Sequence, residues 1–419
     1  MTWISFEETD YQRAASVVQW NLRVEPAPPM HSYELTLPHK IVFGVGKRRE
    51  VGGIARTLGL RAILITGSKT LEKLGFVRQL IDDLEQAGIS ILTTETISRE
   101  PETQDVDRLL SRLRGLLLPG DFVIGFGGGS AIDLGKAIAA LLPQEEDAPV
   151  IDYLEGVGRG LKLKQPPLPI LAIPTTAGTG AEVTKNAVIA SYDPPFKKSL
   201  RHDRMMPQAV VIDPELTLHC PPKVTAESGL DAITQLLESY VSRKRQPFTD
   251  ALVEQGLPKS IIALETLLTK PDDLEARCAM AHGAMLSGLA LTNSGLGMAH
   301  GVAPALGTHC RVPHGAACAL MLPTTLRTNV EVCADRYAKL SRLLFGFVSN
   351  VSDKLATERL IDRIEQLCRA FGLPMRLSDC GIDKTLIPAI ARDSKGNSMS
   401  GNPKELSESD IEKILRKIF

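Results

Sequence analysis

Short apolar runs alternate with amphipathic stretches through the first half of the chain, and this alternation sets the fold class. The apolar runs, which are typical of buried strands, cover residues 61–67, 90–95, 121–130, 169–176 and 209–216. The stretches around 71–86 and 106–117 lie between them and carry the apolar spacing of helices. Strands and helices in alternation indicate a mainly parallel sheet that is covered on both faces.

The pattern changes near residue 218. From there to the last residue, long helical periodicities are separated by glycine and proline, with no convincing strand. We therefore expect an α/β domain over residues 36–217, an all-α domain over 218–419, and a ligand cleft between them. The pairs Pro194-Pro195 and Pro221-Pro222 are expected to mark the crossing. Residues 1–35 predict an extension that packs late or is partly mobile.

Composition excludes several classes of partner. The chain has 419 residues, 43% of them hydrophobic, and a net charge of -1, so it is large enough for two domains. It has no basic excess to bind nucleic acid or anionic lipid. The N-terminus lacks an apolar signal region, and no run approaches the roughly 20 apolar residues of a membrane span. We therefore predict a cytoplasmic protein with no nucleic-acid or membrane partner.

The cysteine pattern argues against a disulfide framework. The seven cysteines are an odd number, they lie between Cys220 and Cys380, and none has CxxC spacing. The same spacing argues against a thiolate zinc site. Cys310 and Cys318 are therefore interpreted as small buried hydrophobic residues.

A glycine-rich turn, residues 127–130 (GGGS), follows the apolar run DFVIGF and precedes a predicted helix. Glycine lets the backbone approach a pyrophosphate closely, and the amino end of the helix attracts its charge. The spacing is not GxGxxG, and such a turn also occurs without a ligand. Asp133 and Lys136 fall on the first helical turns, where the simpler interpretation is a solvated ion pair.

A second segment rich in small residues, 174–189, follows the next predicted strand. Its polar side chains are Thr175, Thr176, Thr179, Thr184 and Asn186. These groups suit hydrogen bonds to the phosphates, ribose and carboxamide of a dinucleotide. The alternative is an ordinary loop.

Two His-Gly dipeptides, which begin at His300 and His314, lie fourteen residues apart among small apolar residues. Two imidazoles do not close a divalent-metal site. Asp231 and Gln235 lie four residues apart on a predicted helix and project from the same face. A buried carboxylate needs a partner, which a cation would supply. Alternatively, Asp231 caps a turn and Gln235 forms local hydrogen bonds.

With these segments in this order, the chain resembles the iron-containing (group III) alcohol dehydrogenases over about residues 36–419. The motifs that carry the resemblance are PHKIVFGVG, GGGSAIDLGKAIA, PTTAGTGAEVT, DPELT, GLDAITQLLESY, the double His-Gly stretch and NPKELSESDIEKIL. The resemblance implies a Rossmann-like dinucleotide-binding domain joined to a helical metal-binding domain, which is the dehydroquinate synthase-like fold. It also implies reduction of aldehydes or ketones, or oxidation of alcohols, with NAD(P)(H) and Fe²⁺ or Zn²⁺, in a homo-oligomer.

Site residues follow from the same resemblance, position by position. The implied metal ligands are Asp231, Gln235, His300 and His314. The implied cofactor contacts are Gly128, Gly129, Ser130, Asp133, Thr175, Thr176, Thr179, Asn186, Lys198 (or the adjacent Lys197) and Leu216. The family usually has His where Gln235 stands, which predicts weaker metal binding because an amide oxygen is a poorer donor. Many members have another His where Pro304 stands, and proline cannot relay a proton.

The turn at the end of the first predicted strand, residues 61–67, bears on cofactor preference. Many NAD-preferring members of the family have an acidic residue there, whereas this chain has Gly67, Ser68 and Lys69. No carboxylate repels a 2′-phosphate, and Ser68 and Lys69 could accept one. The sequence therefore predicts NADP in preference to NAD.

Two other functions stay open. A related-fold enzyme, such as a maleylacetate reductase or a sugar-phosphate cyclase, would need basic residues in the cleft, which Arg201, Arg204 and Arg311 could supply if they are not surface charges. A nucleotide-binding protein that has lost catalysis would explain Gln235 and Pro304. The sequence does not name the substrate.

Overall fold

The computed structural model describes residues 32–145, 147–346 and 351–419 of the chain. The chain divides into two units, Met1–Glu34 and Leu35–Phe419. The extension expected over residues 1–35 lies almost wholly outside the described residues.

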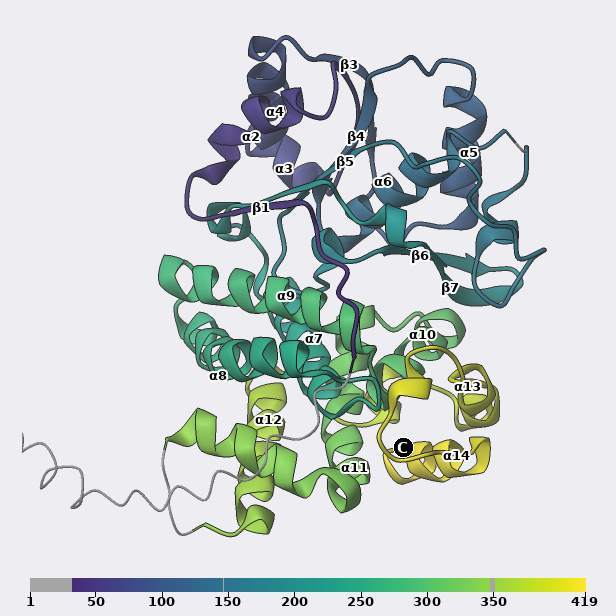
Figure 1. Cartoon of the computed structure of the whole chain (residues 1–419). Helices are drawn as coiled ribbons and strands as arrows, with labels where there is room; N and C mark the ends of the chain where they lie inside the picture. Colours follow the sequence, from purple (N-terminus) through teal and green to yellow (C-terminus); the bar gives the residue numbers. More distant parts are fainter. Residues whose placement is uncertain (1–31, 146, 347–350) are drawn as a thin grey trace, which may run out of the picture. The chain divides into compact units, whose positions relative to one another are not determined.

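A six-stranded parallel sheet forms the first half of the unit, with the strand order β1-β8-β5-β4-β2-β3 (Figure 1). Its strands are β1 (Lys40–Phe43), β2 (Arg61–Thr66), β3 (Ser90–Thr96), β4 (Asp121–Gly127), β5 (Ile170–Pro174) and β8 (Ala209–Ile212). The five strands expected from the apolar runs are all present. β1 adds a sixth, at the edge next to β8.

Helices cover both faces of this sheet, as the alternation predicted. They are α2 (Val51–Arg56), α3 (Lys69–Lys73), α4 (Phe76–Gln86), α5 (Thr103–Leu113) and α6 (Gly129–Leu141). Leu64 of β2 packs in the cluster with α2 and α4, whereas Ile63 and Ile65 pack with α5 and α6, because successive strand residues point to opposite faces. The expected helix over 71–86 is interrupted, since Gly75 adopts φ 79° between α3 and α4.

An antiparallel hairpin, β6 (Asn186–Tyr192) and β7 (Pro195–Arg201), stands apart from the main sheet. The sequence analysis did not predict it, since the end of segment 174–189 was expected to be a polar loop. Pro194-Pro195 lies at the turn of this hairpin and does not mark the domain crossing. Pro221 and Pro222, at the start of the first long helix, do mark it.

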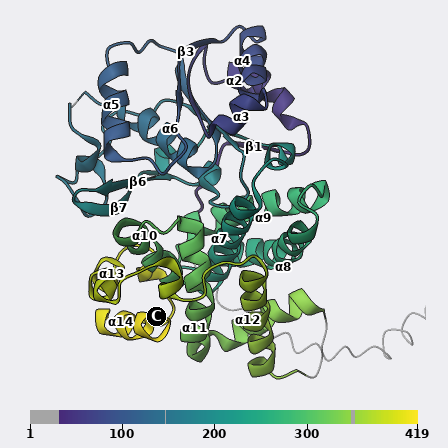
Figure 2. The ribbon, with the colours of Figure 1, turned by 180° about the vertical axis from the view of Figure 1, so that it is seen from behind.

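The second half is helical, as expected, and no described strand follows β8. The helices are α7 (Pro222–Val241), α8 (Pro247–Thr269), α9 (Leu274–Ser294), α10 (Met298–Cys310), α11 (His314–Phe345), α12 (Asp353–Ala370), α13 (Ile387–Asp393) and α14 (Glu408–Lys417) (Figures 1 and 2). Among the described helices, none combines the length and the apolarity that a membrane span requires.

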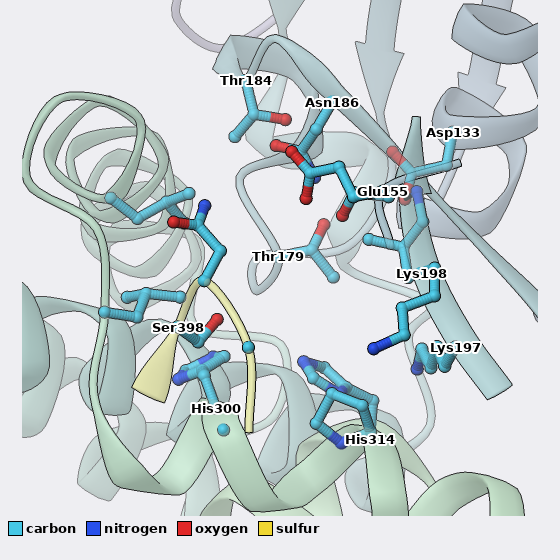
Figure 3. Close-up of a pocket in the computed structure, with 18 of the residues that line it drawn as sticks. Asp133, Glu155, Thr179, Thr184, Asn186, Lys197, Lys198, His300, His314 and Ser398 are labelled. Atoms are coloured by element: carbon cyan, nitrogen blue, oxygen red, sulfur yellow. Dashed lines mark hydrogen bonds between the residues drawn. The ribbon is translucent and has the colours of Figure 1, made fainter. Parts of the chain in front are cut away.

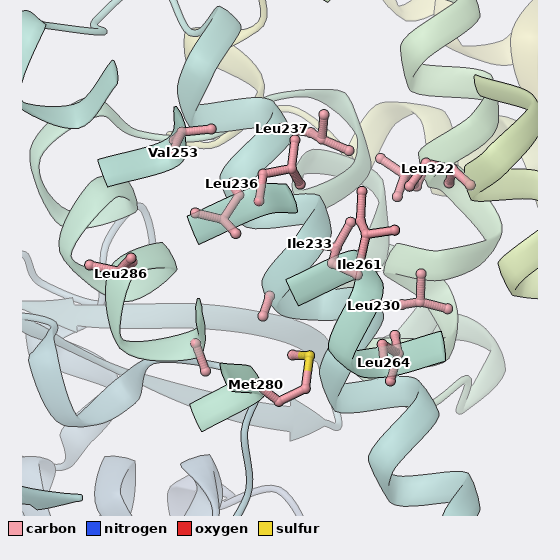
Figure 4. Packing of buried hydrophobic residues seen from close by; sticks show 14 of the residues in the cluster. Leu230, Ile233, Leu236, Leu237, Val253, Ile261, Leu264, Met280, Leu286 and Leu322 are labelled. Atoms are coloured by element: carbon pink, nitrogen blue, oxygen red, sulfur yellow. The ribbon is translucent and has the colours of Figure 1, made fainter. Parts of the chain in front are cut away.

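Helix α7 lies at the centre of this half and packs against α8, α9 and α11. Its residues Leu230, Ile233, Leu236 and Leu237 are completely buried and belong to the large apolar core (Figure 4). Gly229 permits close packing there, because a Cβ atom at this position would lie 2.7 Å from Leu264. A helix buried on nearly all sides can carry polar side chains only where other groups satisfy them.

Candidate active site

A cavity of about 260 Å³ lies between the two halves, lined by the amino end of α6, the hairpin, and residues of α7, α10 and α11 (Figure 3). It lies where the sequence predicts a cleft between the α/β half and the helical half. The residues expected at the site that line it are Gly129, Ser130, Asp133, Thr179, Asn186, Lys198, Asp231, Gln235, His300 and His314. Pro304 lines it too.

The remaining cofactor residues expected from the sequence lie outside this lining. They are Gly67, Ser68, Lys69, Gly128, Thr175, Thr176 and Leu216. All follow the carboxyl ends of β2, β4, β5 or β8, the edge at which parallel α/β sheets bind ligands. Ser68 and Lys69 are exposed, whereas Leu216 is buried in the core beside the sheet.

The glycine-rich turn joins β4 directly to α6, as the sequence predicted. A Cβ atom at Gly127 would lie 2.8 Å from the Cα atom of Gly67, and one at Gly129 would lie 2.7 Å from Oγ1 of Thr179. Side chains at these positions would therefore collide with the next strand end and with the neighbouring loop. The amino end of α6 opens at Gly129 and Ser130 into the cavity, where its free N–H groups suit an anion.

Asp133 and Lys136 are not the solvated ion pair that the sequence suggested. The side chain of Lys136 is completely buried, and its Nζ lies 3.0 Å from Oδ1 of Asp133. It also donates to the carbonyl of Ala181 and to Oγ1 of Thr184, at 2.8 and 2.9 Å. Burial lowers the pKa of Lys136, and Asp133 opposes that change. The buried ammonium therefore ties α6 to the loop that borders the cavity.

A cluster of metal-binding side chains forms where α7, α10 and α11 meet. The donor atoms of Asp231, His300, His314 and Cys318 all lie within 4.8 Å of one another. Nε2 of His300 lies 3.1 Å and Nε2 of His314 lies 3.7 Å from Oδ1 of Asp231. Asp231 and His300 are 1% and 5% exposed, so water does not satisfy the carboxylate. The structure thus brings together three of the four residues expected as ligands and adds Cys318.

Charges in this cluster favour a cation. Burial lowers the pKa of His300, but contacts with Cys318, Asp231 and Glu238 raise it well above its ordinary value. Burial, together with the nearby ammonium of Lys197, lowers the pKa of His314 to about 4. His314 is therefore a neutral imidazole at pH 7, the form that binds a metal, and the carboxylates attract positive charge.

Glu238 orients His300. Its Oε2 atom lies 2.7 Å from Nδ1 of His300, and its Oε1 accepts the backbone N–H of Ala299 at 2.6 Å. With the Nδ1 proton held there, Nε2 is the nitrogen that faces Asp231, as in the carboxylate–histidine pairs of many metal sites. The sequence analysis missed Glu238, although it lies seven residues, or about two helical turns, after Asp231.

Gln235 lies beside the cluster, and its amide nitrogen faces Asp231. Nε2 donates to Oδ2 of Asp231 at 3.2 Å and to the carbonyl of Thr179 at 3.3 Å, and Oε1 accepts from Ser287 at 2.7 Å. Both groups around Nε2 can only accept hydrogen bonds, which fixes the orientation of the amide. The NH2 group of an amide donates hydrogen bonds and does not bind a cation. In this orientation Gln235 therefore holds the carboxylate of Asp231 in place.

The three arginines considered for a phosphate-bearing substrate do not converge. Arg201 lines the cavity but is paired with Glu155 at 2.8 Å. Arg204 is exposed, and Arg311 lies outside the lining and stacks on the ring of Tyr192 at 3.8 Å. These three arginines therefore form no basic cluster, and the other basic residues in the lining are Lys197, Lys198 and Lys395.

Two further parts of the lining, Glu100 and the segment 394–398, were not predicted from the sequence. Glu100 pairs at 2.6 Å with Lys197 of β7, which was expected from the sequence as the alternative to Lys198. The segment 394–398 adds polar groups, and Ser398 lies near His300 in Figure 3. Both segments reach the site from elements distant in sequence, so no local pattern indicates them.

A parallel α/β domain with a glycine-rich turn, facing a buried carboxylate–histidine cluster across one cavity, is the arrangement of metal-dependent dinucleotide oxidoreductases. The comparisons with known proteins agree. The iron-containing alcohol dehydrogenase model matches residues 38–214, and the C-terminal model of the same family matches residues 225–419. The chain belongs to the iron-containing alcohol dehydrogenase family and is an oxidoreductase acting on CH-OH groups.

Relatives match over nearly the whole chain. Long-chain-alcohol dehydrogenase 1 of Geobacillus thermodenitrificans (strain NG80-2) is 32% identical over 87% of this chain and 91% of its own length. An NADPH-dependent butanol dehydrogenase of Clostridium saccharobutylicum is 30% identical over 92% of this chain and 97% of its own. A crystal structure of 1,3-propanediol oxidoreductase superposes with a TM-score of 0.85 at 30% identity, covering 93% of this chain and 100% of that one.

Replacing Glu238 tests the orientation of His300. We expect Glu238→Ala to weaken binding of a divalent metal about 10- to 100-fold, because His300 loses the acceptor that fixes its Nδ1 proton. Glu238→Gln should weaken metal binding less, since its amide oxygen can still accept the hydrogen bond from Nδ1 of His300. Competition with a chelating dye measures the affinity, with Glu227→Gln on the same helix as control. Equal affinity in Glu238→Ala and the parent would show that this contact does not support the site.

Proposed function

We propose that the chain is a metal-dependent, NAD(P)-linked alcohol dehydrogenase or aldehyde reductase that transfers hydride between nicotinamide and a small alcohol or carbonyl compound. One observation carries the proposal. Asp231, His300 and His314 form one wall of the same cavity that Gly129 and Ser130, at the amino end of α6, border from the other half. Metal and dinucleotide would therefore meet in one enclosed space.

The metal would be held by Asp231, His300 and His314. Gln235 stands at the fourth ligand position that the family pattern implies, and it would have to turn its amide oxygen toward the ion to bind it. The fit rests on chemistry: one carboxylate and two imidazoles suit Fe²⁺ or Zn²⁺. When bound, the ion supplies Lewis-acid polarisation of the substrate oxygen. The protein contributes the neutral imidazole of His314 and, through Glu238, the acceptor that holds the Nδ1 proton of His300, so that Nε2 would bind the ion after losing its proton.

The cofactor would lie along the carboxyl edge of the sheet. The N–H groups at Gly129 and Ser130 suit the pyrophosphate, and Thr179, Asn186 and Lys198 offer hydrogen bonds toward the nicotinamide end. Gly67, Ser68 and Lys69 would receive the adenosine ribose and its 2′-phosphate. The relative from Clostridium saccharobutylicum is named for its use of NADPH, which supports NADP as the preferred cofactor.

The substrate would be small. Leu291, Leu296 and Pro304 supply apolar lining near the cluster, and the nicotinamide would share the cavity volume of about 260 Å³. The scattered arginines give no support to a sugar-phosphate substrate. A cytoplasmic location and a homo-oligomeric state are part of the proposal, and they rest on sequence composition and on the family resemblance.

Turnover and metal content test this function together. Purified protein, reconstituted with Fe²⁺ or Zn²⁺, is expected to bind about one ion per chain and to oxidise NADPH with short-chain aldehydes, followed by absorbance of the reduced cofactor. His300→Ala should abolish both metal binding and turnover, because it removes an imidazole donor. His309→Ala, on the same helix but outside the cluster, should retain both. The proposal would be refuted if the reconstituted protein bound no metal or showed no turnover. It would also be refuted if His300→Ala kept the turnover of the parent.

Cofactor preference is tested at Gly67. The parent is expected to bind NADP(H) more tightly than NAD(H), and Gly67→Asp should reverse this by placing a charge beside the 2′-phosphate. A Cβ atom at Gly67 would lie 3.1 Å from the Cα of Gly127, so Gly67→Ala serves as the control for steric cost. Equilibrium titration of both cofactors gives the affinities. Equal or tighter NAD(H) binding in the parent contradicts the preference.

A further inference from the structure

The metal cluster contains a thiol that the family-derived ligand set does not include. We propose that Cys318, in place of Gln235, is the fourth protein ligand of a divalent metal held by Asp231, His300 and His314, and that the site selects Zn²⁺ over Fe²⁺. The inference rests on the metal centre of the proposed function and changes its composition.

Geometry places Cys318 in the ligand set. It lies four residues after His314 on α11, so both side chains project from one helix face. The distance from its Sγ atom to Nε2 of His314 is 3.7 Å. The distance from the same Nε2 atom to Oδ1 of Asp231 is also 3.7 Å. In a tetrahedral zinc site, with metal–nitrogen about 2.0 Å and metal–sulfur about 2.3 Å, neighbouring ligand atoms lie about 3.3 to 3.6 Å apart. Closing these donors around one ion therefore needs only small side-chain shifts.

Gln235 turns its amide nitrogen, and not its oxygen, toward Asp231. Its Nε2 donates to Oδ2 of Asp231 and to the carbonyl of Thr179, and its Oε1 lies 2.7 Å from Oγ of Ser287. Rotating the amide by half a turn would place its oxygen against these two acceptors, and its nitrogen would keep only Oγ of Ser287, whose hydroxyl also lies 2.8 Å from the carbonyl of Ala284. The arrangement therefore keeps a donor toward Asp231, whereas Sγ of Cys318 lies among the donor atoms of the cluster.

Cys318 lies at the edge between an apolar core and the metal-binding side chains. Its side chain is completely buried and belongs to the apolar cluster of α10 and α11, and its Sγ also lies beside a carboxylate and two imidazoles. Binding of the ion would release the thiol proton, since a coordinated thiol is deprotonated. A thiolate is a soft donor, and a set of one sulfur, two nitrogens and one oxygen selects zinc rather than iron.

Cobalt(II) is the probe, because a thiolate bound to Co²⁺ gives intense sulfur-to-metal charge-transfer absorption that oxygen and nitrogen ligands do not give. Full-length parent protein loaded with Co²⁺ is expected to show this absorption. Cys318→Ser should lose it, and its Zn²⁺ affinity should fall at least about tenfold. Cys310→Ser, which removes a cysteine outside the cluster, and Gln235→Ala should both keep the absorption.

Absence of the band in cobalt-loaded parent, or its retention in Cys318→Ser, overturns the assignment. Loss of metal binding in Gln235→Ala, together with unchanged metal binding in Cys318→Ser, also overturns the assignment. If Cys318→Ser does not fold, X-ray absorption of zinc-loaded parent decides: one sulfur neighbour supports the proposal, and only nitrogen and oxygen neighbours overturn it. None of these measurements uses turnover, so the two proposals can fail separately. An active enzyme without a metal–sulfur contact would refute only this inference. An inactive protein with that contact would refute only the proposed function.

Discussion

Two buried carboxylates on one helix, those of Asp231 and Glu238, impose the arrangement around them. Each is at most 2% exposed, and a buried carboxylate costs several kcal/mol unless charge and hydrogen bonds compensate it. The imidazole of His300 lies between them, and His314 approaches Asp231 from the next helix. These contacts join α10 and α11 to α7, and they form the cluster of donor atoms that would hold a divalent ion.

The same helix connects the metal cluster to the nucleotide-binding half. Thr179 occupies the space that a side chain at Gly129 would fill, and its carbonyl accepts a hydrogen bond from Gln235. Close by, Gly180 lies against Gly288 of α9, where a Cβ atom would lie 2.5 Å from the opposing backbone. The glycine-rich turn and Asp231 are thus joined through the loop that carries Thr179.

Much of this architecture could be predicted from sequence, because it depends on local patterns. Apolar runs located five strands, and the strand–glycine–helix order located the turn between β4 and the amino end of α6. Features that depend on contacts distant in sequence escaped: the β6–β7 hairpin, the burial of Lys136 and the hydrogen bond from His300 to Glu238. Cys318 is buried among apolar residues, as the sequence predicted, but nothing in its own segment shows that Asp231 lies close to it. Its spacing of four residues from His314 was the available signal.

The central claim is that one divalent ion binds between the helices beside the cofactor. The most direct measurement is a crystal structure of the metal-reconstituted protein with NADP⁺, using anomalous scattering at the edge of the added metal. The account predicts one anomalous peak within about 2.0 to 2.3 Å of Asp231 and of Nε2 of His300 and His314. No peak after reconstitution, or a peak whose ligands exclude both imidazoles, would contradict it.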